Sequence, residues 1–182
     1  MPLPFPPDFK SLLHTKTWLK LLGWVGLALV VMVVVNKVQH GGLLAPNAPA
    51  PALRLPLSTG ELLELPAQGV TVLAFWAEWC GPCRAEVPEL REVHKALVQD
   101  GGRVVGVSVN ARSLRDAQAR ALPLGIDYPV AVADDALSRA YRVSRLPTLY
   151  VLRPDGTIQD AFVGGVSART LLRSAARAAQ GG

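Results

Sequence analysis

The chain has 182 residues, enough for one domain of ordinary size and an appendage. It carries 19 Lys or Arg against 14 Asp or Glu, but from residue 53 onward the balance is 15 against 13. The excess of positive charge therefore lies near the N-terminus, and we expect no nucleic-acid partner.

An apolar segment dominates the N-terminal part. It runs from Trp18 to Val35 and is interrupted only by Lys20. As a helix these residues would span roughly 27 Å, and we expect one transmembrane helix over residues 18–36. The run is long for a cleaved signal peptide, and prolines crowd the nearest small-residue cleavage site. Lysines are more numerous before the segment than after it, which predicts a cytoplasmic segment 1–17 and an extracytoplasmic remainder on a bacterial inner membrane.

Residues 37–52 are rich in Pro and Ala, and this composition predicts an extended tether without a core of its own. A folded domain is expected over residues 53–182. Its expected strands cover two short stretches around the turn 58–60, and 70–77, 103–110, 128–134, 145–152 and 157–164. Helices are expected over 84–100, 113–125, 135–143 and 167–179. This alternation favours an α/β fold with a mixed sheet covered on both faces.

The two cysteines, Cys80 and Cys83, directly follow the strand 70–77 and enclose Gly81 and Pro82. A structural bridge across two residues closes almost no loop and would add little stability. A zinc site needs about four ligands, and the chain has no second cysteine pair to supply them. His94 follows several turns along the same helix and is expected at the edge of the core. A two-coordinate copper(I) site stays open as an alternative.

Electron exchange suits the spacing of the two thiols better. A helix N-terminus favours the thiolate form of Cys80 through the helix dipole and free backbone N–H groups. Cys83, one turn further on, is placed to attack the mixed disulfide and release the product. We therefore predict a redox-active pair that needs no metal and no cofactor.

A close resemblance to the thioredoxin superfamily signature lies in the stretch FWAEWCGPC, and both Pro88 and the sequence LPT at 146–148 extend it. Residues 111–135 read as an inserted helix and strand. Together with the apolar segment and the stretch CRAEVPEL, this insertion resembles the membrane-tethered TlpA/ResA/DsbE group. The resemblance implies a thioredoxin fold with a central mixed sheet and an inserted helix–strand unit, and thiol-disulfide oxidoreductase activity.

The resemblance also assigns roles around the cysteines. Pro147 would be a cis-proline beside the sulfurs, and the backbone of Leu146 would pair with a client strand. The platform for the client is expected to include Trp79, Gly81, Pro82, Leu146 and Thr148.

One acid is expected to have a catalytic role. Glu86 stands where ResA-like proteins have an active-site glutamate, so it is a candidate proton acceptor that tunes the thiols. The alternative is a solvated acid in the first turn. Thioredoxins have a buried aspartate at the position of Ala74, so another group must carry the proton of Cys83. Glu78 is expected to be simply exposed.

The resemblance favours a reductase of disulfide-containing client proteins, supplied with electrons by a transmembrane thiol carrier of the DsbD or CcdA kind. Cytochrome c biogenesis is a possible setting, although Thr148 stands where the haem-maturation branch has a glutamate. A disulfide-introducing oxidase is the alternative within the same chemistry, and CGPC rather than CPHC argues against it. A copper(I)-binding assembly factor is the alternative from another class, although no histidine follows residue 94.

Overall fold

The computed structural model describes residues 21–32 and 42–181, and the chain divides into two compact units between Gly41 and Gly42. Residues 21–32 form a helix. The expected cytoplasmic segment 1–17 and both ends of the expected transmembrane segment lie outside the described residues. Within the described ranges, every helix falls short of the length or the apolar character that a membrane span requires.

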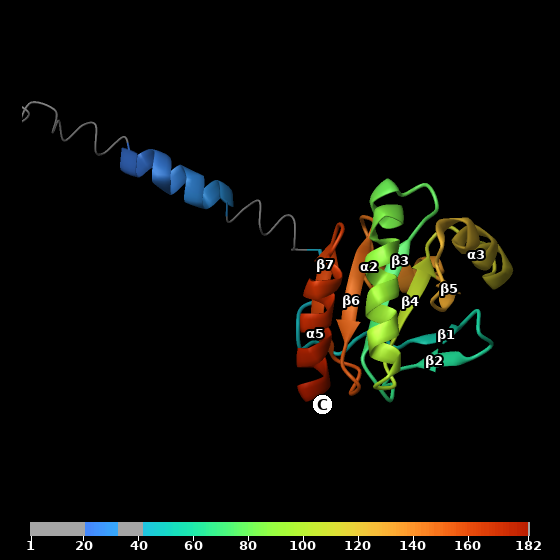
Figure 1. Cartoon of the computed structure of the whole chain (residues 1–182). Coiled ribbons are helices and arrows are strands. Elements are labelled where there is room, and N and C mark those ends of the chain that lie inside the picture. Colours follow the sequence, from blue (N-terminus) through green and yellow to red (C-terminus); the bar gives the residue numbers. More distant parts are fainter. Residues whose placement is uncertain (1–20, 33–41, 182) are drawn as a thin grey trace, which may run out of the picture. The chain divides into compact units, whose positions relative to one another are not determined.

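A five-stranded mixed sheet forms the centre of the second unit (Figure 1). The central strand β3 (Thr71–Trp76) is buried along its whole length, as expected for a β-branched and aromatic run. It pairs in parallel with β4 (Arg103–Ser108) and antiparallel with β6 (Thr148–Leu152). The strands are, in sheet order, β5 (Val130–Val132), β4 (Arg103–Ser108), β3 (Thr71–Trp76), β6 (Thr148–Leu152) and β7 (Ile158–Val163).

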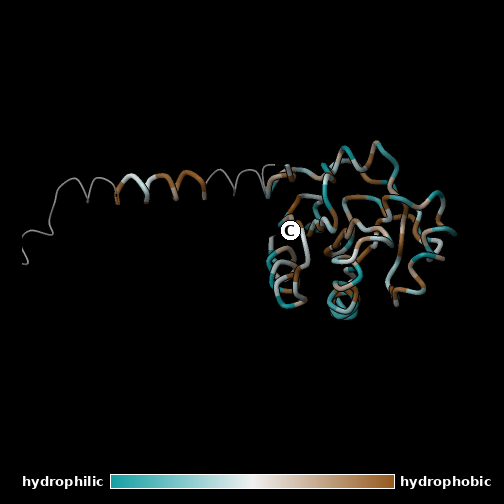
Figure 2. The backbone as a smooth tube through the Cα atoms, turned by 90° about the horizontal axis from the view of Figure 1, so that it is seen from above, coloured by the Kyte–Doolittle hydropathy of each residue, from teal (hydrophilic) through white to brown (hydrophobic). Residues whose placement is uncertain are grey.

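Two helices, α2 (Gly81–Val98) and α5 (Ala168–Gln180), cover one face of the sheet. Figure 2 looks along them and shows both on the same side of the strands. Their apolar side chains, among them Val93 and Leu171, are fully buried against β3, β4 and β6. Each such side chain contributes about 1.5–3 kcal/mol of hydrophobic stabilisation, so α2 is fixed firmly on the sheet.

The other face is covered by the hairpin of β1 (Arg54–Pro56) and β2 (Leu62–Glu64) and by the segment that precedes it. Leu43 and Leu44 pack against this core, and the amide of Asn47 donates to the Ile158 carbonyl over 2.7 Å. These residues fall within the expected tether. Residues 42–52 therefore lie against the sheet, and the folded domain begins before residue 53.

Two tyrosines hold this segment in place. The hydroxyl of Tyr150 donates to the Tyr141 carbonyl over 2.6 Å and accepts from the Leu44 amide at 3.4 Å. The hydroxyl of Tyr141 donates to the Pro51 carbonyl over 3.1 Å. The two rings also pack edge-on against each other, with their centres 5.4 Å apart.

The inserted unit consists of α3 (Leu114–Ala121), the 3-10 turn η2 (Leu122–Leu124) and the edge strand β5. Ala117 and Ala121 of α3 pack against Val130 and Trp76 beside the cysteines. The expected insertion of a helix and a strand is thus present, and it lies next to the active-site end of the sheet. The short helix α4 (Asp135–Ala140) leads from β5 towards β6.

Candidate active site

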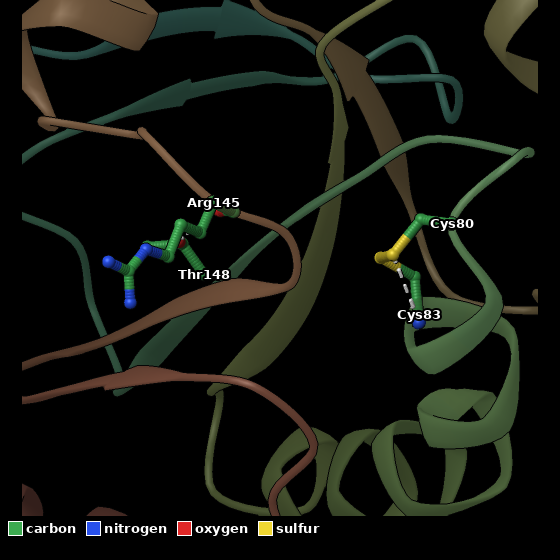
Figure 3. Close-up of a disulfide and its surroundings, with 4 residues drawn as sticks. All are labelled: Cys80, Cys83, Arg145 and Thr148. Carbon is green, nitrogen blue, oxygen red and sulfur yellow. Dashed lines mark hydrogen bonds between the residues drawn. A yellow bond between two sulfur atoms is a disulfide. The ribbon is translucent and has the colours of Figure 1, made fainter. Parts of the chain in front are cut away.

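The two cysteines lie where the loop after β3 enters α2. Cys80 is the N-cap residue, and its sulfur accepts a hydrogen bond from the Cys83 amide at 3.2 Å (Figure 3). The sulfurs form a disulfide, and the two Cα atoms are 5.3 Å apart. Both residues are about 95% buried. A thiolate on Cys80 would therefore face the positive end of the helix dipole.

The expected client platform divides into exposed and buried parts. Gly81 and Pro82 are exposed, and the Trp79 side chain is 66% exposed. Leu146 is half-buried. Pro147, which was expected beside the sulfurs and not on the platform, is buried, and its bond to Leu146 is cis as expected.

One residue of the expected platform lies beneath its surface. The side chain of Thr148 is fully buried, and its hydroxyl donates to the Arg145 carbonyl over 2.7 Å. Figure 3 shows the Arg145 guanidinium pointing away from the disulfide. Thr148 therefore holds the loop before β6 and offers no side-chain surface to a client, which corrects its expected place on the platform.

Glu86 is buried, with only 3% of its surface exposed, so it is not a solvated first-turn acid. Its Oε1 accepts a hydrogen bond from the Val166 amide over 2.7 Å. Burial raises the pKa of Glu86 to about 7, and the neighbouring charge of Glu89 adds to this rise, whereas the bond from Val166 opposes it. Glu86 and Cys83 line the same small cavity of about 10 Å³, near the minimum that admits one water molecule.

Glu78 has a different environment from the one expected. Its carboxylate accepts a hydrogen bond from the Asn110 side chain over 2.6 Å and forms an ion pair with Arg120 of α3. Glu78 is therefore part of a network that joins the loop before Cys80 to the inserted helix. Sequence reasoning missed Asn110 and Arg120, because their only signal is a contact across 32 and 42 residues that local patterns do not encode.

The histidine that follows the cysteine pair in sequence has a backbone partner. His94 lies on α2, where its Nδ1 accepts a hydrogen bond from the Val104 amide at 3.1 Å. Burial lowers the pKa of His94, which favours the neutral ring that accepts this bond. No group of three or more His, Cys, Asp or Glu side chains lies close enough together to hold a metal in the described ranges 21–32 and 42–181.

Comparison with known proteins places this site in a family. Residues 46–161, more than half of the chain, match the AhpC/TSA family. The chain belongs to the AhpC/TSA family. It is 33% identical over 126 residues to the thioredoxin-like protein YneN of Bacillus subtilis, covering 67% of this chain and 74% of YneN. It is 29% identical over 139 residues to the thiol-disulfide oxidoreductase ResA of Oceanobacillus iheyensis, covering 72% of this chain and 69% of ResA.

A solved structure similar to this AhpC/TSA family member is the thiol:disulfide interchange protein DsbE of Chlorobium tepidum. The two share 28% identity with a TM-score of 0.65, covering 74% of this chain and 98% of the other. The expected thioredoxin-like fold and the resemblance to the ResA/DsbE group are therefore confirmed. With its Cys80–Cys83 pair at a helix N-terminus, the protein is a thiol-disulfide oxidoreductase.

Proposed function

We propose that the protein reduces disulfide bonds of extracytoplasmic client proteins. The arrangement around the cysteine pair supports this proposal. The disulfide lies at the start of α2, Trp79 next to Cys80 is exposed, and the buried Glu86 lines a cavity together with Cys83. Cys80 as thiolate attacks a client sulfur, forms a mixed disulfide and releases the first client thiolate. Cys83 then loses its proton and attacks the Cys80 sulfur, which releases the second client thiolate and transfers two electrons in all.

Beyond the helix dipole, the site offers little stabilisation to thiolates, and this bears on the direction of electron flow. The sulfur of Cys80 accepts one amide hydrogen bond, from Cys83, because Pro82 has no N–H to donate. Gly81 and Pro82 also bring no cationic side chain. An ionised Glu86 behind Cys83 further disfavours a second negative charge there. A reduced form that is poorly stabilised gives up its electrons readily, which supports a reductase over an oxidase.

Glu86 is the proposed proton acceptor for Cys83. With a pKa of about 7 it exchanges protons readily at neutral pH, where a general base is most effective. Both residues line the same cavity, whose volume of about 10 Å³ is near the minimum for one water molecule, and a water there would relay the proton. This role replaces that of the aspartate that thioredoxins have at the position of Ala74.

The backbone beside Pro147 is the proposed docking edge for the client. Leu146 precedes β6, and its N–H and C=O make no backbone hydrogen bond within the described part of the chain. A client segment in extended conformation would pair with these groups across from Cys80. Trp79, Gly81 and Pro82 would then contact the client side chains around its disulfide.

A single membrane anchor over residues 18–36 and an extracytoplasmic domain complete the proposal. The support is the apolar run and the excess of lysines before it, as read from the sequence. The oxidised pair would be reduced again by a transmembrane thiol carrier of the DsbD or CcdA type. Alkaline extraction of membranes tests the anchor, because an integral protein stays in the pellet and a peripheral one is released.

The reduction potential of the Cys80–Cys83 pair is the test of the proposed direction. The full chain in a neutral detergent is equilibrated with dithiothreitol buffers, and its thiols are trapped by alkylation. A value near that of thioredoxin, roughly −270 mV, is expected for a reductase. A value near that of the strong oxidants, roughly −120 mV, would overturn the proposal and make the protein a disulfide donor.

A further inference from the structure

We propose that Glu78 and Arg120 form an ionic clamp through which the inserted helix α3 positions Trp79 and Cys80 for protein clients. The inference rests on the proposed function, because it assigns the two residues a role in binding the clients of the same disulfide. Neither residue touches the sulfurs in the contacts described, so both are positioning residues.

Both oxygens of the Glu78 carboxylate are occupied. Oε2 accepts from the Asn110 amide group over 2.6 Å, and Oε1 pairs with the Arg120 guanidinium. The bond from Asn110 and the charge of Arg120 hold the pKa of Glu78 below its ordinary value, so the carboxylate is ionised at neutral pH. Glu78 and Arg120 are only about one-third exposed, which reduces the screening of their charges by solvent.

The Arg120 side chain is held in place from its own helix. Its Nε donates to Asp116 Oδ1 over 2.8 Å, one turn earlier in α3. Asp116 in turn accepts from the Arg112 amide over 2.9 Å, and its own amide donates to the cap residue Ser113 over 3.2 Å. Because the guanidinium is already oriented, its pairing with Glu78 loses less side-chain entropy than that of a free surface arginine.

The Asn110 side chain is anchored on the sheet. Its Oδ1 accepts from the hydroxyl of Ser108 at 3.3 Å, and Ser108 is fully buried at the end of β4, opposite Trp76 of β3. Glu78 therefore links three parts of the fold: the end of β4, the helix α3 and the loop that carries the nucleophile.

Trp79, which follows Glu78, depends on these contacts for its orientation. Ala77 is fully buried and Cys80 is 96% buried, whereas Trp79 between them is 66% exposed. An indole this exposed gains little orientation from packing, so its direction depends on the backbone of residues 77–80. Ala77 and Cys80 pack against apolar residues of the inserted unit, and Glu78 adds an ion pair with Arg120 that ties this short loop to α3.

The test compares a large and a small disulfide substrate. The full chain in neutral detergent is kept reduced by dithiothreitol and mixed with insulin or with oxidised glutathione. After subtraction of the uncatalysed reduction, kcat/KM is measured for the wild type, Glu78→Gln, Arg120→Gln and the double variant. We expect kcat/KM for insulin to fall roughly 3- to 10-fold in each single variant. The double variant should fall no further, because both changes break the same contact. Oxidised glutathione is too small to need the platform, so its kcat/KM in each variant should stay within about 2-fold of the wild-type value.

Two further variants separate positioning from general stability. Arg91→Gln removes the 2.8 Å ion pair between α2 and Asp127, which also ties the inserted unit to the domain but does not touch the loop 77–80. Arg91→Gln should leave kcat/KM for insulin unchanged. Arg120→Lys keeps the positive charge, so its kcat/KM for insulin should lie between those of Arg120→Gln and the wild type.

Three outcomes would overturn the clamp. The Glu78 and Arg120 variants could keep the wild-type kcat/KM for insulin, or they could lose kcat/KM equally for insulin and for oxidised glutathione. Arg91→Gln could also lower kcat/KM for insulin as much as they do. Failure of the proposed function gives a different result. In that case the wild type would reduce neither substrate, or its reduction potential would lie near that of the strong oxidants.

Discussion

The carboxylate of Glu86 accepts a hydrogen bond from the backbone amide of Val166, 80 residues further along the chain and 2.7 Å away. Glu86 belongs to α2 and Val166 lies two residues before α5, so the bond joins α2 to the segment that leads into the other helix on this face of the sheet. One amide stabilises a buried carboxylate only in part, and the pKa of Glu86 accordingly rises to about 7. The same contact thus helps to fix the fold and leaves the acid able to exchange protons.

The first prediction concerns the pH dependence of client release. In the wild type, Glu86 loses its proton as the pH rises through about 7 and then accepts the proton of Cys83. The rate at which Cys83 resolves the mixed disulfide should rise across that range. Glu86→Gln should remove this step in the profile and slow resolution at pH 8 by at least about 10-fold. Single-turnover measurements between pH 5.5 and 8.5, with the mixed disulfide trapped by acid, would show this.

Glu89→Gln is the matched control for this experiment. Glu89 lies on the same helix and accepts a similar bond, from the Ala168 amide over 2.6 Å, but it does not line the cavity beside Cys83. Its variant should keep the step in the profile, moved to lower pH because the charge of Glu89 no longer raises the pKa of Glu86. If Glu86→Gln and the wild type gave superimposable profiles, Glu86 would have no part in proton transfer.

The second prediction concerns stability. Because the folded-state pKa of Glu86 lies above its ordinary value of 4.5, the folded protein binds more protons than the unfolded chain between these two values. Its free energy of unfolding should therefore fall as the pH rises from 4.5 to about 7. The full effect is at most roughly 3 kcal/mol, at about 1.36 kcal/mol for each pKa unit. In Glu86→Gln this decline should vanish, so that the variant is more stable than the wild type at pH 8. Urea unfolding of the oxidised form at several pH values tests it, and parallel curves for both proteins would contradict it.

The sheet and the cysteine pair were predictable because their signals are local. The apolar run ending at Trp76 and the alternation of strands and helices gave the mixed sheet. The spacing of Cys80 and Cys83 at a helix start indicated their chemistry. Both depend on residues that are close in sequence, where periodicity and turn residues are informative.

Contacts between distant segments were not predictable in the same way. The pairing of Glu78 with Arg120 and of Glu86 with Val166 depends on how loops and helices meet in three dimensions. The segment before residue 53 was misread for a similar reason. Its composition is typical of a tether, but Leu44 is held by Tyr150, which comes 106 residues later. Composition carries no information about such a partner.

The third prediction tests this attachment. Tyr150→Phe removes the hydroxyl that bonds the Tyr141 carbonyl and the Leu44 amide. We expect the free energy of unfolding to fall by about 1–2 kcal/mol, because the buried Tyr141 carbonyl loses that donor. Amide hydrogen exchange should also accelerate in residues 43–52. Tyr128→Phe is the control, since the Tyr128 hydroxyl has no hydrogen-bond partner among the residues described, and it should change exchange in this segment little. Unaltered exchange in Tyr150→Phe would mean that other contacts suffice to hold the segment.

The fourth prediction concerns a close backbone crossing at the start of β3. A Cβ atom at Gly69 would lie 2.6 Å from the backbone carbonyl of Gly101, a distance that real side chains do not tolerate. Gly69→Ala therefore forces the two loops apart, and the free energy of unfolding should fall by about 1–3 kcal/mol. Gly165→Ala is the matched control, because a Cβ there meets no atom within 4 Å and its φ is not positive. It should change stability by less than about 0.5 kcal/mol in the same denaturation experiment. Equal losses in the two variants would mean that the close crossing at Gly69 does not decide the outcome.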